Sequence, residues 1–294
     1  MMFACNQLNS GNFFMTKFKD LVRLIRPKHW LKNFLVFAPI FFAGEIFLDD
    51  KLDKSLMAFA VFCLAASGVY IVNDIFDKEK DQSHPFKKFR PLASGSIKIS
   101  LAVFLAIILF TASLILSFFF VKGILLVILL YVILNFFYST FLKHWPIFDF
   151  LAVAVFYLLR VLAGGLASET FMSGWLILCV LFVSLFLVVG KRIKEMKNLD
   201  RRKVLDDYND VFLNQVLTST ATLSIISYGV YTVLGLDSPY AVYSNLFVVL
   251  GIFRYLFLIS SSGETEFPEN LIFTDKVVLT SVLGWILFMY FIFY

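Results

Sequence analysis

Long apolar segments recur along this chain at a length that matches the thickness of a lipid bilayer. A helix needs about 20 mostly apolar residues to cross the hydrocarbon core of a membrane, and about nine segments of this kind can be marked. Only 16% of the 294 residues are charged, against roughly 25% in a soluble domain. The sequence therefore predicts an all-α fold, a polytopic membrane bundle of about nine transmembrane helices. The segments are Trp30–Phe47, Lys54–Val72, Ile99–Val121, Gly123–Phe141, Ile147–Ala167, Gly174–Gly190, Val216–Leu236, Tyr240–Ile259 and Val277–Tyr294.

These segments leave little chain for anything else. A large separate soluble domain is excluded, and we expect a single transmembrane domain over residues 15–294. Residues 1–14 lack the basic start and apolar core of a signal peptide. We interpret them as a disordered tail, with an upstream start codon before Met15 as the alternative. The three cysteines are scattered without the spacing of a metal site or of paired disulfides, which favours buried apolar roles.

The basic residues predict the orientation of the bundle. Cytoplasmic connections of membrane proteins carry an excess of Lys and Arg. Here 22 of the 26 basic residues fall on one side of the predicted spans, which includes the N-terminus and all the long loops. We therefore expect the N-terminus and the polar motifs in the cytoplasm, and the C-terminus on the outside.

One polar stretch, beginning at Asn73, ends the second apolar segment. Read as a helix, Asp74, Asp77 and Asp81 fall at i, i+3 and i+7, so their carboxylates line one face, with Asn73 beside Asp77. Mg²⁺ prefers one or two carboxylates together with the oxygens of a bound phosphate. A solvated loop of mixed charge is the alternative, but Asn73 and Asp74 continue an apolar span directly. The stretch thus favours metal or phosphate binding.

Basic and polar side chains on the same side of the membrane are candidate phosphate ligands. Asp149 and Arg160 are 11 residues apart on the fifth span, which places them on one helix face about 16 Å apart. A structural ion pair of Arg160 is the alternative, and a role at the lipid surface is preferred for Lys194 to Lys203. The candidate substrate-binding residues are Lys32, Asn73, Lys87, Arg90, Tyr138, Lys143, Asp149, Arg160, Lys191 and Arg192.

The aspartate motif in this setting resembles the UbiA-type superfamily of intramembrane prenyltransferases. There an NDxxDxxxD motif, here Asn73 to Asp81, ends the second helix. The second aspartate-rich motif of typical members, DxxxD after the fourth helix, is missing, and residues 143–149 contain the single acid Asp149. This departure argues against ordinary prenyl transfer. Residues 26–33, 84–95 and 190–192, with the late pattern from Arg254 to Asp275, look instead like one branch, the decaprenyl-phosphate phosphoribosyltransferases.

That resemblance implies an enzyme that moves 5-phosphoribose from phosphoribosyl pyrophosphate (PRPP) to a polyprenyl phosphate at the cytoplasmic face of the cell membrane. Mg²⁺ is the implied cofactor, and Asp74, Asp77 and Asp81 are the implied metal ligands and catalytic residues. Two alternatives stay open: a prenyltransferase acting on an aromatic or quinone precursor, and a transporter or lipid-binding protein without chemistry. No nucleic-acid partner is indicated, and a homo-oligomer is compatible with the sequence.

Overall fold

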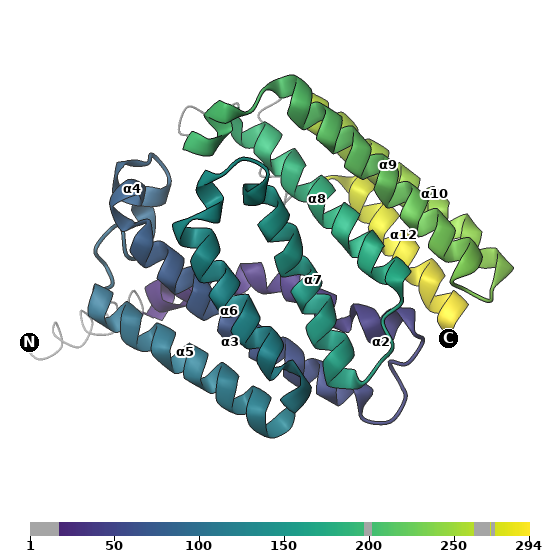
Figure 1. The fold of residues 1–294 in the computed structure, drawn as a ribbon, viewed down its shortest axis with the longest axis horizontal. Helices are drawn as coiled ribbons and strands as arrows, with labels where there is room; N and C mark the ends of the chain where they lie inside the picture. The colour runs from purple at the N-terminus through teal and green to yellow at the C-terminus, as the bar shows by residue number, and fades with distance from the viewer. Residues whose placement is uncertain (1–17, 197–201, 262–270, 272–273) are drawn as a thin grey trace, which may run out of the picture.

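The structure is a computed structural model that describes residues 18–196, 202–261, 271 and 274–294. Every regular element within these residues is helical (Figure 1), and eight helical segments are long and apolar enough to cross a membrane. The predicted all-α membrane bundle is therefore confirmed, whereas the predicted tail at residues 1–14 lies outside the described residues. The eight are α3 (Lys51–Phe76), α5 (Ile99–Phe120), η3 (Lys122–Ile124) with α6 (Leu125–Thr140), α7 (Phe148–Ser168), α8 (Gly174–Met196), α9 (Asp210–Leu234), η6 (Pro239–Ser244) with α10 (Asn245–Ser260), and α12 (Lys276–Phe293).

The first apolar segment does not form one regular helix. Its residues are divided between a 3-10 helix, η1 (Pro27–Phe37), and the short helix α2 (Ala38–Phe42). Pro39 lies in the first turn of α2, where a residue without a backbone N–H is tolerated, although it interrupts an α-helix arriving from upstream. The predicted count of about nine spans thus corresponds to eight long segments and this broken one.

η1 packs against α7 at very short range. A Cβ atom built on Gly164 of α7 would lie 1.8 Å from the carbonyl oxygen of Val36. Since no side chain fits in that space, the glycine is what allows the two backbones to approach each other. η1 contacts α3 as well as α7, and this placement buries the side chain of Asn33 between the helices.

Helix α7 lies at the centre of the bundle and contributes to two of its three apolar cores. One core joins α7 to α8, α9 and α10, and another joins it to η1, α3 and α6. The third packs residues 18–25 against α3 and α5. Figure 1 shows α7 between α6 and α8. Polar residues on α7 can therefore meet partners from both halves of the molecule.

The connections that follow α3, α6 and α8 gather at one end of the bundle (Figure 1). The opposite end holds the turn over residues 43–50 and the C-terminus, because the Tyr294 hydroxyl accepts a 3.0 Å hydrogen bond from the backbone N–H of Ile46. A site built from several helices can thus form at the first end. Its short elements are α4 (Lys78–Ser83), η2 (Lys87–Phe89), η4 (Leu142–His144) and η5 (Lys203–Asp207).

Candidate active site

The three predicted aspartates lie where α3 ends and α4 begins. α3 stops at Phe76 and Asp77 forms the junction, yet the helical hydrogen bonds continue through it. The Asp77 N–H donates to Asn73 O (2.9 Å), and the Asp81 N–H donates to Asp77 O (2.8 Å). The side chains of Asp74 and Asp81 are each only 4% exposed, whereas that of Asp77 is 36% exposed. Two carboxylates therefore form a buried floor and the third lies at its edge.

Each of the three carboxylates is paired with a basic side chain. One nitrogen of Arg90, Nη1, bridges two of them, at 3.2 Å from Asp74 Oδ1 and 2.5 Å from Asp81 Oδ2. Arg26 donates to the same oxygen of Asp74. Lys143, from the connection between α6 and α7, lies 2.9 Å from Asp77 Oδ1. The charges of the three carboxylates are thus neutralised by three basic side chains from three separate segments.

This arrangement bears on whether the aspartates fit a divalent cation. Within the described ranges, no group of three or more acidic, histidine or cysteine side chains is close enough to hold a metal. Two hard oxygen ligands are nevertheless suitably placed, because Asp74 and Asp81 already share the single positive centre of Arg90. Mg²⁺ in proteins commonly takes one or two carboxylates and completes its shell with water and substrate phosphate. The residues present therefore fit that ion.

Helix α6 is tied directly to the aspartate motif. The Ser139 hydroxyl donates a hydrogen bond to the side-chain oxygen of Asn73, and Asn135 lies one turn earlier on the same buried face of α6. The Asn135 side-chain amide donates to the Tyr131 carbonyl oxygen at 2.7 Å. The Ser139–Asn73 bond holds the end of α3 against α6, and so helps to fix the carboxylates that follow.

A second charged network lies between α7, α8 and η5. Arg192 is buried, and its Nε donates to Asp149 Oδ2 at 2.7 Å, while its Nη1 donates to Glu195 Oε2 at 2.7 Å. The other carboxylate oxygen of Asp149 accepts a 2.6 Å hydrogen bond from the Tyr208 hydroxyl. Asp149 is fully buried and both of its oxygens are occupied. Its main effect in this arrangement is to position the Arg192 guanidinium.

The hydroxyl oxygen of Tyr138 accepts hydrogen bonds from two arginines. Arg202 Nη1 lies 3.0 Å from its hydroxyl oxygen and Arg192 Nη2 lies 3.4 Å away. Arg202 Nε also lies 3.6 Å from Glu195 Oε2, and Arg192 is paired with both Asp149 and Glu195, so the two arginines are balanced by two carboxylates. Arg202, whose side chain is 36% exposed, is the member of this network that can also bind an anion through its planar fork of N–H donors.

Lys87 experiences the charges of both networks. Burial, and next the Arg90 charge, lower the pKa of the Lys87 amine below its usual range, and Arg202 acts in the same direction. Asp81 and Glu195 act against that decrease in pKa. Charges from the aspartate motif and from the second network thus reach one side chain, which indicates that the two networks border one shared site.

A third polar group lies deeper, within the membrane-spanning region. Arg160 is 4% exposed, and its Nε donates to Asn33 Oδ1 at 2.8 Å. It also donates to the Phe156 carbonyl oxygen at 2.5 Å and to the Tyr131 hydroxyl at 3.3 Å. Ionisable residues at such depth are costly and commonly mark functional paths.

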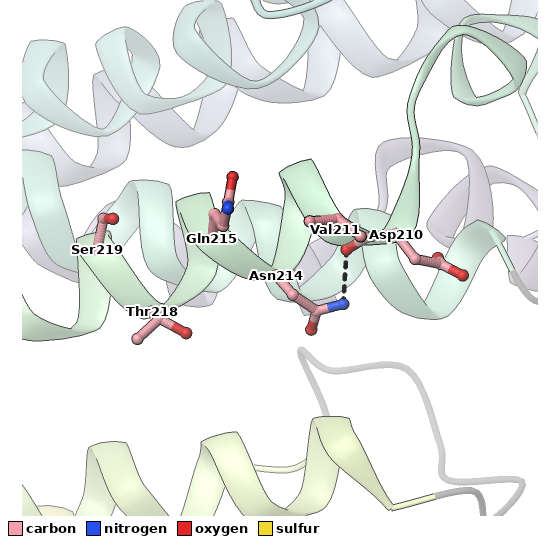
Figure 2. A pocket seen from close by; sticks show the side chains of 6 residues that line it. All are labelled: Asp210, Val211, Asn214, Gln215, Thr218 and Ser219. Atoms are coloured by element: carbon pink, nitrogen blue, oxygen red, sulfur yellow. Dashed lines mark hydrogen bonds between the residues drawn. The ribbon is translucent and has the colours of Figure 1, made fainter.

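A hollow on the surface of α9 lies outside these networks. Its volume is about 570 Å³, and Figure 2 shows the six side chains that line it on the first turns of that helix. The Asn214 amide turns back to the carbonyl oxygen of Asp210, 2.7 Å away. The six residues supply one carboxylate and no basic group, so we place the candidate site at the aspartates instead. They are Asp210, Val211, Asn214, Gln215, Thr218 and Ser219.

Sequence similarity to known proteins extends over most of the chain. A sequence model of the UbiA prenyltransferase family matches residues 34–273. The chain belongs to this family. The chain is 34% identical over 286 residues to the decaprenyl-phosphate phosphoribosyltransferase of Mycolicibacterium smegmatis, and the match covers 90% of each protein. The corresponding protein of Mycobacterium tuberculosis is 35% identical over 277 residues, covering 90% of this chain and 91% of the relative.

The fold of the UbiA-family chain also agrees with a solved structure. The UbiA homolog from Archaeoglobus fulgidus bound to GPP and Mg²⁺ superposes with a TM-score of 0.72 at 19% identity, covering 93% of this chain and 99% of that one. The UbiA-like fold, the family and the enzyme class predicted from the sequence are confirmed.

The structure brings most of the predicted site residues of this UbiA-family protein to one end of the bundle. Arg160 is the deepest of them, and Lys32 is close enough to Tyr131 to act on it electrostatically. Lys191 acts in the same way on Glu195. In the late pattern, Arg254 and Asp275 form an ion pair of 2.8 Å, whereas the residues between 262 and 270 lie outside the described part of the chain.

Five residues of the site were not assigned from the sequence. Arg202 and Glu195 lie within the stretch Lys194 to Lys203, for which the sequence favours a role at the lipid surface, and Arg26 lies in residues 26–33, which are noted only for their resemblance. The sequence predicts no role for Ser139 or Tyr208. The following Pro27 favours an extended backbone at Arg26, so it does not predict the observed placement of this residue. Arg26 adopts a left-handed conformation with φ +55°, and its guanidinium reaches Asp74.

Proposed function

We propose that this protein transfers the 5-phosphoribosyl group of PRPP to a polyprenyl phosphate in a Mg²⁺-dependent reaction that releases pyrophosphate. One observation carries the proposal: where typical relatives have a second acidic motif, this chain has the basic residue Lys143 and a single acid, Asp149, which is paired with a buried arginine. Lys143 faces Asp77, and Asp149 is committed to Arg192. The similarity to decaprenyl-phosphate phosphoribosyltransferases over 90% of the chain agrees with it.

The aspartates would hold the metal-bound diphosphate of the donor. Asp74 and Asp81 are the buried pair that shares one positive centre, and Asp77 lies at the open edge. Bound there, Mg²⁺ would stabilise the negative charge that develops on the leaving oxygens. Asn73, fixed by Ser139, would help to orient the diphosphate against the end of α3.

The basic residues would bind phosphate groups of both substrates: the donor's diphosphate, the ribose 5-phosphate and the phosphate of the lipid acceptor. An ionised phosphate is already nucleophilic, so attack on ribose C1 requires no strong general base. The residues proposed for these phosphates are Lys32, Lys87, Arg90, Lys143, Arg160, Lys191 and Arg192, and Tyr138 is proposed to orient the guanidinium groups beside it.

The site would face the cytoplasm at the cell membrane. The aspartates, Lys87 and Lys143 share one end of the bundle with the connections that carry most of the basic residues (Figure 1). An excess of Lys and Arg is the usual mark of cytoplasmic connections. Tyr294 lies at the opposite end, beside Ile46, which would place the C-terminus outside.

A transfer assay tests this function. Purified protein is incubated with Mg²⁺, polyprenyl phosphate and labelled PRPP, and we expect label in the lipid fraction. Asp77→Asn should lose most of the rate, because it removes a charge from the edge of the diphosphate site, whereas a transporter or lipid-binding protein would tolerate it. Release of pyrophosphate from a prenyl diphosphate, with none from PRPP, would instead support the prenyltransferase alternative.

A further inference from the structure

The three bases that neutralise the aspartates differ from them in accessibility. The side chains of Arg26, Arg90 and Lys143 are 19%, 30% and 19% exposed, whereas those of Asp74 and Asp81 are 4% exposed. Asp74 and Asp81 are therefore fixed in the protein, and Arg26 and Arg90 approach them from the open side. A ligand that enters from that side meets these two arginines before the two buried carboxylates, whereas at the edge Asp77 (36% exposed) is more accessible than Lys143.

The charge balance of this cluster limits what can bind. Three carboxylates face three cations, so the cluster is neutral as it stands. A divalent cation alone would add positive charge beside Arg26 and Arg90 in a partly buried site, where like charges repel strongly. A divalent cation that enters with a diphosphate brings its own balancing negative charge. The pair therefore brings no excess positive charge to the bases, which can turn from the carboxylates to the phosphate oxygens.

We propose that Arg26, Arg90 and Lys143 exchange partners when the donor binds, releasing the aspartates to the metal and taking the diphosphate oxygens in their place. The inference rests on the proposed function only in that the donor is a metal-bound diphosphate. Arginine and lysine bind phosphate as readily as carboxylate, so each base has a partner in both states. Metal and diphosphate then promote each other's binding, and this coupling is reciprocal.

Lys143 is the simplest of the three bases at which to test the exchange. It has one carboxylate partner, Asp77, which is itself the most exposed of the three acids. Removing the lysine charge leaves Asp77 free to bind a cation without any diphosphate. It also removes one ligand from the bound diphosphate. The exchange therefore predicts opposite effects of one substitution on the two ligands.

Binding of Mn²⁺ to the full-length protein in detergent, measured by isothermal titration calorimetry with and without inorganic pyrophosphate, tests the exchange. For the unaltered protein we expect Mn²⁺ to bind at least about tenfold more tightly when pyrophosphate is present, a difference of about 1.4 kcal/mol. Lys143→Gln should bind Mn²⁺ alone more tightly than the unaltered protein, and the Mn²⁺–pyrophosphate pair more weakly. Lys143→Arg, which keeps the charge, should behave like the unaltered protein.

Lys98→Gln is the matched control, since it removes one positive charge from an exposed lysine just before α5. It should change neither affinity. Equal Mn²⁺ affinity with and without pyrophosphate would overturn the exchange, as would identical binding by Lys143→Gln and the unaltered protein. Pyrophosphate is released from both PRPP and prenyl diphosphates. The result is therefore independent of the transfer assay, and failure of the exchange can be told apart from failure of the proposed function.

Discussion

Replacing Asp149 with asparagine removes the buried charge that links α7 to α8. Asp149 Oδ2 lies 2.7 Å from Arg192 Nε, and the two side chains are 0% and 2% exposed. Asparagine has nearly the same shape and still accepts the hydrogen bond from Tyr208. The substitution therefore tests the charge rather than the packing.

The expected loss follows from the burial of this pair. Removing one partner of a buried ion pair costs about 3–5 kcal/mol, because the other charge is left uncompensated. Glu195 still pairs with Arg192 at 2.7 Å, which favours the lower end, about 3 kcal/mol. At about 2–4 °C per kcal/mol, the midpoint of thermal unfolding should fall by about 6–12 °C.

Thermal unfolding in detergent micelles measures this loss, with Asp275→Asn as the matched control. Asp275 pairs with Arg254 at the surface and caps α12 through the N–H groups of Val277 and Val278. Asparagine can form the same cap, and an ion pair at the surface contributes little to stability. Asp275→Asn should therefore lower the midpoint of thermal unfolding much less than Asp149→Asn does.

A double variant, Asp149→Asn with Arg192→Gln, tests the cause of the loss. Its loss of stability should be smaller than the sum of the losses of the two single variants, because each single variant leaves the other member of the pair without its partner. Equal shifts in Asp149→Asn and in the surface control would refute the reasoning. Losses that simply add in the double variant would do so as well.

Two further predictions concern packing and pH. Gly164→Ala should destabilise the protein by more than about 3 kcal/mol, because the new Cβ would meet the Val36 carbonyl oxygen. Gly174→Ala is the control and should be neutral, since no atom lies within 4 Å of its new Cβ. The yields of folded protein from the two variants are compared. Burial, and next the Arg90 charge, lower the pKa of Lys87 in the folded protein. Between this lowered pKa and the usual lysine value of about 10.4, the unfolded chain therefore binds more protons than the folded protein. The free energy of unfolding should rise with pH over that range. Thermal unfolding should show that rise, and Lys87→Met should remove it.

The bundle and the position of the aspartates could be predicted because both depend on short-range patterns. Span length is visible in the apolar segments, and the spacing of Asp74, Asp77 and Asp81 is a local property of one helix. The hydrogen bonds that carry this spacing across the α3–α4 junction confirm that the three residues follow helical geometry. The interruption of the first span at Pro39 could have been read from that proline alone.

The partners of the aspartates could not be predicted, because they come from distant segments. Arg26 reaches Asp74 across 48 positions of sequence, and Lys143 reaches Asp77 across 66. Asp149 was expected to bind substrate, and that remains a prediction. Its complete burial and its two occupied oxygens depend on how α7 is rotated against α8, which a single sequence does not specify.

The central claim, transfer of phosphoribose to a lipid phosphate, is tested most directly by following the two ends of the donor separately. PRPP labelled in its 5-phosphate and PRPP labelled in its diphosphate are each supplied with Mg²⁺, polyprenyl phosphate and the purified protein. We predict that the 5-phosphate label appears in the lipid and that the diphosphate label is released as pyrophosphate. The claim is contradicted if the lipid acquires no 5-phosphate label while the same preparation consumes a prenyl diphosphate.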